Sequence, residues 1–122
     1  MSKQITGRAY VRVDGKQYPS RDGAVLKPGM VSRKPVIGAD GVHGYVEKVL
    51  SPSIECSLSH NNELSIEELQ NIVGATIMFE CDTGPIYILR EAWCDPESLD
   101  LTVGDGEVKV TFNGVAVEEV SG

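Results

Sequence analysis

The sequence has no long apolar run and no recognisable targeting segment. Of its 122 residues, 41% are hydrophobic, yet no stretch approaches the roughly 20 apolar residues that a membrane-spanning helix requires. The N-terminus leads directly into patterned sequence, without the charged and then apolar regions of a signal peptide. We therefore expect one domain over residues 1–122, with no membrane contact, in the cytoplasm of the producing cell.

Cysteine and histidine are too few and too widely spaced for a disulfide framework or a zinc site. The three cysteines, Cys56, Cys81 and Cys94, are odd in number, and none forms a C-x-x-C pair. We expect them to be small buried or half-buried side chains. The two histidines, His43 and His60, are expected in exposed loops. No metal ion and no cofactor is predicted.

Signatures of catalysis and phosphate binding are also missing. Gly38, Gly41 and Gly44 follow a G-x-x-G-x-x-G spacing, which is neither the dinucleotide fingerprint nor the phosphate loop with its closing Lys-Ser or Lys-Thr. No G-x-S-x-G motif is present. Paired carboxylates such as Glu67 and Glu68 are typical of a solvated surface. The sequence therefore predicts no catalytic residues and a protein that is not an enzyme.

Acidic residues dominate the composition, but unevenly. The net charge of −7 divides into +5 over residues 1–50, with nine Lys/Arg and four Asp/Glu, and −12 over residues 51–122, with two Lys/Arg and fourteen Asp/Glu. Overall acidity disfavours tight binding to nucleic-acid phosphates. The asymmetry suits an assembly in which the basic part of one copy meets the acidic part of the next, because such complementarity steers association.

Alternating apolar residues predict short strands over most of the chain. In residues 6–13, Ala9, Val11 and Val13 share one face, and Ile54, Cys56 and Leu58 do so in residues 53–59. Other strands are predicted at 16–18, 24–27, 75–81, 85–92, 99–103, 107–112 and 115–120. These are about eight or nine short strands, apart from those of the arm described below.

Three Asx-Gly pairs predict tight hairpins: Asp14-Gly15, Asp105-Gly106 and Asn113-Gly114. Residues 82–84 predict a further turn. Most connections are therefore local, which is typical of antiparallel sheets. The predicted fold is mainly β, an antiparallel sandwich or barrel with one short helix on its flank.

That helix is predicted at about 65–73. Ser65 and Glu68 have the spacing of a capping box, with Ser65 as N-cap. Gly74 stands where a glycine often ends a helix. The apolar residues of the segment fall on one helical face: Ile66, Leu69, Ile72 and Val73.

Residues 30–50 predict a long protruding hairpin arm. Its limbs are partly apolar and basic, Pro35 interrupts the first limb, and three glycines within residues 38–44 predict a flexible tip. Apolar side chains on a projecting arm need a cover, and a neighbouring subunit would supply it. The residues predicted to make this inter-subunit contact are Val31, Arg33, Lys34, Val36, Ile37, Val42 and Tyr45.

Several segments, in this order and spacing, carry a resemblance to a known family. They are TGRAYVRVDG (6–15), RKPVIGADGVHGY (33–45), PSIEC (52–56), the helix with the strand after it (64–80), GPIYILREAW (84–93) and GEVKVTFNG (106–114). Together they span nearly the whole chain. The sequence resembles the tail tube protein family of Mu-like contractile-tailed phages.

The resemblance implies a structural virion protein. Six copies would form a ring, and rings would stack head to tail into a hollow tube, inside a contractile sheath, through which DNA passes without specific binding. Implied partners are the tail sheath, baseplate and tail-terminator proteins and the tape measure protein in the lumen. The protein would be assembled in the host cytoplasm and found in the virion tail. Similar subunits build phage-derived contractile bacteriocins and secretion tubes, which is the alternative reading.

Two other functions compete with the tube subunit. A β-barrel module that binds oligonucleotides would use Arg8, Tyr10 and Arg12, which alternate along one strand. A small hydrolase would need His43, His60 and nearby carboxylates to converge. Salt-dependent affinity for single-stranded nucleic acid would identify the first, and a close approach of His43, His60 and the carboxylates in the structure would identify the second.

Overall fold

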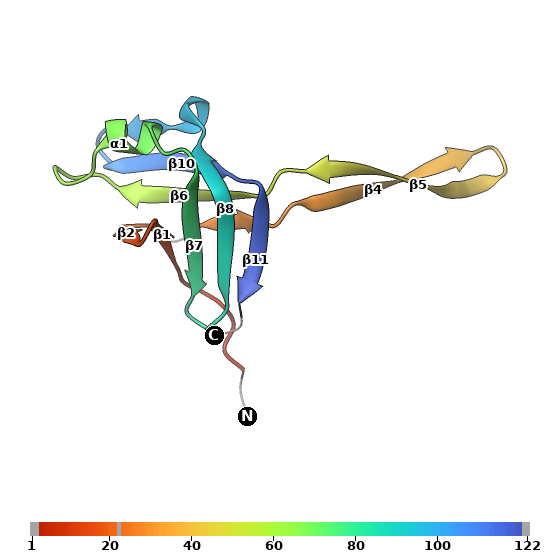
Figure 1. Ribbon diagram of the computed structural model, residues 1–122, viewed down its shortest axis with the longest axis horizontal. Coiled ribbons are helices and arrows are strands. Elements are labelled where there is room, and N and C mark those ends of the chain that lie inside the picture. Colours follow the sequence, from red (N-terminus) through yellow and green to blue (C-terminus); the bar gives the residue numbers. More distant parts are fainter. Residues whose placement is uncertain (1–2, 22, 121–122) are drawn as a thin grey trace.

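The computed structural model describes residues 3–21 and 23–120, a β-rich body from which one long hairpin projects (Figure 1). The elements in this part of the chain are β1 Ala9–Val13, β2 Lys16–Tyr18, β3 Val25–Lys27, β4 Met30–Gly38, β5 Gly41–Leu50, β6 Ser53–Ser59, α1 Ile66–Gln70, β7 Ala75–Cys81, β8 Ile86–Cys94, the 3-10 turn η1 Pro96–Ser98, β9 Asp100–Thr102, β10 Glu107–Asn113 and β11 Ala116–Val120. All strand pairs are antiparallel. The predicted mainly β fold is confirmed, with eleven strands in the described residues.

The body consists of two sheets that share strand β8. One sheet has the order β2-β1-β7-β8-β11; in the other, β10 lies between β6 and β9, and β3 flanks β6. In Figure 1, β7, β8 and β11 run down the view while β6 and β10 run across it. The last two residues of β8, Trp93 and Cys94, pair with β10. Strand β8 therefore continues from the first sheet into the second.

A β-bulge redirects β8 between the two sheets. Ala75 pairs with Ala92 and Ile77 with Leu89, so β8 carries one more residue than β7 over this interval. Glu91, within it, has a φ of 52°, a left-handed conformation that is uncommon for a residue with a side chain. Such an extra residue bends its strand and increases the local twist.

The core lies between the sheets and is built from the alternating positions. Val11 and Val13 of β1 and Ile54, Cys56 and Leu58 of β6 are buried, as the sequence predicts. The largest fully buried side chains are Phe112, Ile54, Leu58, Leu69, Ile77, Leu89, Val11, Val108 and Val110. Removing such apolar surface from water is the main force that holds the sheets together.

The helix is shorter than predicted. Ser65 is its N-cap, and the Glu68 backbone N–H donates to Ser65 Oγ at 3.2 Å, as predicted. The helix ends at Gln70, before Gly74, and two residues further on the Ile72 carbonyl accepts the backbone N–H of Cys94 in β8 at 3.0 Å. Leu69 is buried, but Val73 is 80% exposed, so placing Val73 on the core face was wrong.

Two predicted hairpins form. Asp14 and Gly15 both have positive φ, at 50° and 88°, and connect β1 to β2 as a two-residue turn, which is the conformation that favours Asp-Gly. The Asp105-Gly106 hairpin also forms, but its loop spans residues 103–106, because Thr102 pairs with Glu107. The turn at residues 82–84 connects β7 to β8.

The third predicted hairpin, at Asn113-Gly114, is wrong. Strand β11 pairs with β8, the strand that both sheets share, rather than with β10. The chain crosses between the sheets at Gly114, where an added Cβ would lie 2.5 Å from Leu89 Cδ1 and 2.9 Å from the Arg90 carbonyl oxygen. Glycine is required here by the close approach of the chain to β8.

The cysteines are free, and two of them are buried. Cys56 and Cys94 lie in the core and Cys81 is half-buried, as predicted. Burial raises the pKa of the Cys56 thiol to about 12. Within residues 3–21 and 23–120, no helix is long and apolar enough to cross a membrane.

Candidate assembly interface

The arm of residues 30–50 is a continuous antiparallel ladder. Strands β4 and β5 pair from Met30 and Leu50 at the body to Gly38 and Gly41 at the tip. Only Ala39 and Asp40 lie between the two strands, so the predicted loop over residues 38–44 is a two-residue turn. The arm extends well beyond the body (Figure 1), and the other described strands pair with neither β4 nor β5.

The predicted contact residues lie on this arm, and most are exposed. Val36 is 41% exposed, Ile37 and Val42 are each 70% exposed, and Tyr45 is 61% exposed. Arg33 and Lys34 are exposed as well, and Val31 is half-buried. The structure adds four apolar residues that sequence reasoning missed: Met30, Val46, Val49 and Leu50. The predicted pairing of the two limbs could have revealed them, because a two-stranded ribbon leaves most of its side chains exposed to water on both faces.

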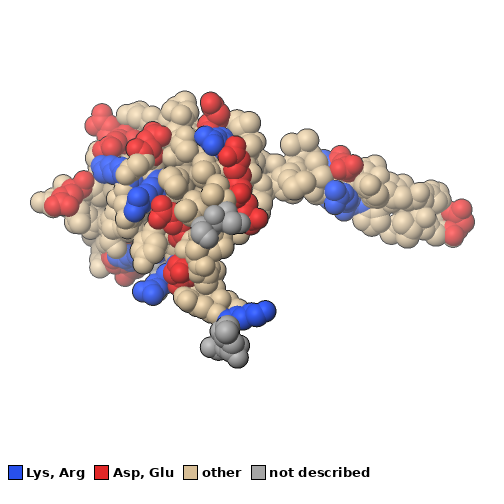
Figure 2. Space-filling model, turned by 60° about the horizontal axis from the view of Figure 1, so that its bottom comes forward, with Lys and Arg blue, Asp and Glu red and all other residues tan. Residues whose placement is uncertain are grey.

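The arm is less basic than the sequence suggested. Residues 30–50 contain three Lys/Arg and two Asp/Glu, a net charge of +1. Arg33 and Glu47, which pair across the ladder, form an ion pair with Nε 3.9 Å from Oε2. Figure 2 shows an arm with few charged groups beside a densely charged body. The exposed surface of the arm is therefore mainly apolar.

The positive charges of residues 1–29 are largely paired within the body. Five of them form ion pairs with carboxylates of residues 51–122: Arg8–Asp82 (3.7 Å), Arg12–Glu80 (3.5 Å), Lys16–Glu68 (3.4 Å), Lys27–Glu55 (3.1 Å) and Arg21–Glu107 (3.9 Å). The charge asymmetry along the sequence thus resolves in large part inside one chain.

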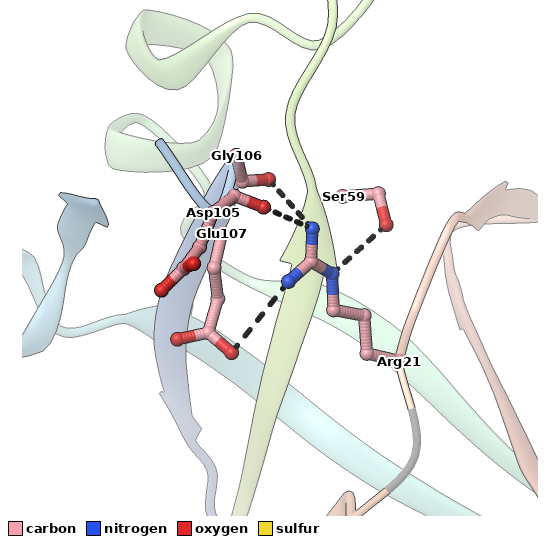
Figure 3. Close-up of polar contacts among 5 residues, drawn as sticks. All are labelled: Arg21, Ser59, Asp105, Gly106 and Glu107. Atoms are coloured by element: carbon pink, nitrogen blue, oxygen red, sulfur yellow. Dashed lines mark hydrogen bonds and ion pairs between the residues drawn. The ribbon is translucent and has the colours of Figure 1, made fainter. Parts of the chain in front are cut away.

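Arg21 is the most extensively bonded of these cations (Figure 3). Its Nε donates to Ser59 Oγ at 3.1 Å, and its Nη2 donates to the carbonyls of Asp105 and Gly106 at 2.6 and 3.1 Å. Nη1 lies 3.9 Å from Glu107 Oε2. Arg21 therefore fastens the segment before β3 to the turn between β9 and β10.

The same pairing argues against an oligonucleotide-binding module. Arg12 in β1 and Arg8 just before it flank Tyr10, but Glu80 of β7 lies beside the Arg12 guanidinium and Asp82 of the following turn beside that of Arg8. A phosphate would have to displace these carboxylates against their repulsion. The strand therefore lacks the positive platform that single-stranded nucleic acid requires.

The two histidines are exposed and lie far apart. His43 is at the tip of the arm, in β5 rather than in a loop, with Nε2 2.6 Å from Asp40 Oδ1. That hydrogen bond lowers the pKa of the Asp40 carboxyl. His60 follows β6 in the body, where its backbone N–H donates to the Gly106 carbonyl. In the described residues, no three His, Cys, Asp or Glu side chains gather as metal ligands would.

An apolar hollow lies where the arm leaves the body. It is lined by Pro28, Met30, Val49, Leu50, Pro52, Val115, Ala116 and Val117. Val115 is 66% exposed and Val49 is 81% exposed. Because these side chains carry no charge and reach from the arm to β11, the exposed apolar surface of the arm extends onto the body.

Comparison with known proteins finds relatives of one kind. The family model described as phage tail tube protein matches residues 2–119. The tail tube protein of the Mu-like prophage FluMu of Haemophilus influenzae is 36% identical over 120 residues, which cover 98% of this chain and 99% of that protein. The tail tube protein of Escherichia phage Mu is 30% identical over 90 residues, covering 74% of this chain and 75% of that protein.

Among solved structures, the cryo-EM structure of the tube-terminating cap of the anti-feeding prophage shares the fold. Its TM-score is 0.71 at 12% sequence identity, over 100% of this chain and 93% of that chain. The relatives in sequence confirm the resemblance inferred from the ordered segments.

Proposed function

Because this chain belongs to the phage tail tube protein family, we propose that its copies form hexameric rings that stack head to tail into the hollow tube of a contractile tail. The family makes the protein a structural component of the virion tail. In this proposal the tube carries DNA without binding it specifically, holds the tape measure protein in its lumen, and ends at the baseplate and tail-terminator proteins. The sheath surrounds it, assembly takes place in the host cytoplasm, and the protein has no enzymatic role.

The observation that carries this proposal is the arm. A two-stranded hairpin alone in water is marginally stable, and this one exposes Ile37, Val42, Tyr45 and Val49 by 61% or more. Burying these side chains against another surface would stabilise the hairpin and would also drive the association with that surface. A neighbouring copy provides such a cover wherever rings stack, since head-to-tail stacking repeats one contact without closing.

The sheet edges supply a second means of association. In the described part of the chain, β11 pairs only with β8 and β3 only with β6, so each keeps one edge with free backbone groups. An unpaired edge is a template for pairing with another chain. Joining such edges between copies would close a ring of sheets.

Electron microscopy of the concentrated, purified protein tests the proposal. We expect rings or tubes, and a strictly monomeric protein would refute it. The arm can be removed along its own register, because Val31 pairs directly with Val49. Replacing residues 32–48 with an Asn-Gly turn should leave the circular dichroism of the body unchanged and abolish stacking. Tubes of normal length from this variant would refute the role of the arm.

A tube subunit of a phage-derived contractile bacteriocin would use the same surfaces. The relatives in sequence come from a phage and a prophage, which favours the virion.

A further inference from the structure

The register of the arm sorts its side chains onto two chemically different faces. Residues that pair directly across an antiparallel ladder point to the same side, and successive residues point to opposite sides. One side, the apolar face, carries the pairs Val31–Val49, Arg33–Glu47, Pro35–Tyr45 and Ile37–Val42. The other side, the lysine face, carries Met30–Leu50, Ser32–Lys48, Lys34–Val46 and Val36–Gly44.

The two faces differ in charge as well as in apolar content. On the apolar face the only charged residues, Arg33 and Glu47, form an ion pair with each other, so this face is neutral. The lysine face carries Lys34 and Lys48 with no carboxylate among its eight residues. Burying unpaired charge is costly, whereas a paired and neutral surface can be covered. The apolar face is therefore the easier of the two to bury.

A β-bulge at His43 completes the apolar face. Val36 pairs with Gly44 and Ile37 with Val42, so His43 is an extra residue on β5. Without this bulge the alternation would place His43, rather than Val42, beside Ile37. The His43 ring instead lies over Gly38, where a Cβ would collide with it, and bonds to Asp40. The tip thus presents two exposed apolar side chains on one side.

We propose that the apolar face is the surface that packs on a second copy of this chain, with Lys34 and Lys48 left at the rim of the contact. This inference rests on the proposed tube function. A second copy fits in charge, because residues 1–29 carry +4 and residues 51–122 carry −12, leaving a body of −8 beside an arm of +1. At the body, Val49 of the apolar face and Met30 and Leu50 of the lysine face together line the hollow beside Val115 and Val117.

Lys34 and Lys48 would then guide the approach of one copy to another and contribute little to the affinity of the contact. Long cationic side chains keep their charged ends in water while their stems cover apolar surface. At the rim of the contact they would meet the carboxylates of the acidic body through solvent, which directs association without adding much affinity. Tube growth should therefore depend on salt more weakly than on the integrity of the apolar face.

Val42→Glu and Val46→Glu form a matched pair that tests this assignment. Both positions are valines in β5, at 70% and 57% exposure, and they lie on opposite faces only because of the bulge. Val42→Glu should raise the protein concentration needed for tube growth by about tenfold or more, because it places a carboxylate in the contact. Val46→Glu should change that concentration by less than about threefold, as surface substitutions usually do.

A second variant separates the role of the apolar face from any disturbance of the turn beside Val42. Tyr45→Glu changes the apolar face away from the turn and should block tubes as Val42→Glu does, while circular dichroism and melting of the monomer stay unchanged. Normal tubes from both variants, or loss of tubes in Val46→Glu alone, would overturn the face assignment while leaving the tube function in place. A wild-type protein that forms no tubes would overturn both.

Discussion

Replacing Gly114 with alanine tests the crossing between the two sheets. The added methyl group would lie 2.5 Å from Leu89 Cδ1, 2.7 Å from Leu89 Cγ and 2.9 Å from the Arg90 carbonyl oxygen. Leu89 is fully buried, and the Arg90 carbonyl accepts the Val115 backbone N–H at 3.0 Å. Neither neighbour can move away freely.

The expected loss follows from two opposing effects. Overpacking a dense core costs about 1–3 kcal/mol, while alanine restricts the unfolded chain and offsets about 0.4–1 kcal/mol of this. The free energy of unfolding should fall by roughly 1–2 kcal/mol, which lowers the melting temperature by about 3–8 °C for a domain near this size.

Urea unfolding in dilute solution measures this loss, with the fluorescence of the single tryptophan, Trp93, as the signal. Gly7→Ala is the matched control, because a Cβ there meets nothing within 4 Å. Equal midpoints for Gly114→Ala and the wild type, or an equal loss in Gly7→Ala, would refute the close-approach argument.

Three further changes probe the body. Ser65→Ala removes the helix N-cap and should lower the free energy of unfolding by about 1 kcal/mol in urea titrations; an unchanged midpoint would mean the cap contributes nothing. Arg21→Met removes the bonds to the turn between β9 and β10 and, after allowance for solvent screening, should cost about 1 kcal/mol and speed proteolysis at residues 103–106; unchanged cleavage would contradict the fastening role. Burial raises the Cys56 pKa from 9.0 to about 12, so the unfolded chain releases its proton first and stability should fall as pH rises from about 9. Urea midpoints measured at increasing pH above about 9 should fall less steeply in Cys56→Ala than in the wild type. Parallel curves for the two proteins would show that Cys56 does not cause the fall.

Local conformation explains which parts of the fold could be predicted. Asp14-Gly15 forms a hairpin because the strands on both sides are neighbours in sequence and in space. Asn113-Gly114 carries the same local signal, yet β10 pairs with β6 along its whole length, and β11 continues along β8 in the register that the end of β10 begins, with Asn113 opposite Trp93 and Ala116 opposite Arg90. Strand partners distant in sequence decided the outcome, and an Asx-Gly pair contains no information about them.

The candidate interface was predictable in position but not in detail. Exposed apolar residues around Pro35 and the glycines indicated the arm, and its pairing is as expected. The faces depend on one bulged residue, His43, and the alternation of the sequence alone would place Val42 on the wrong side. The uneven charge along the sequence was misleading because the partners of Arg8, Arg12 and Arg21 lie 68 to 86 residues away along the chain.

The ladder also sets how the reach of the arm can vary. Each residue added to both strands extends the hairpin by about 3.3 Å, but alternation turns the added pair to the opposite side. One extra pair inserted midway along the arm would rotate Ile37 and Val42 away from the face that holds Val31 and Val49. Only additions of two pairs, about 7 Å at a time, keep a single face. In related chains the length of the arm can therefore change only in steps of two residue pairs if its apolar residues are to stay on one face. A second bulge would allow other lengths, because it would turn the displaced side chains back to that face.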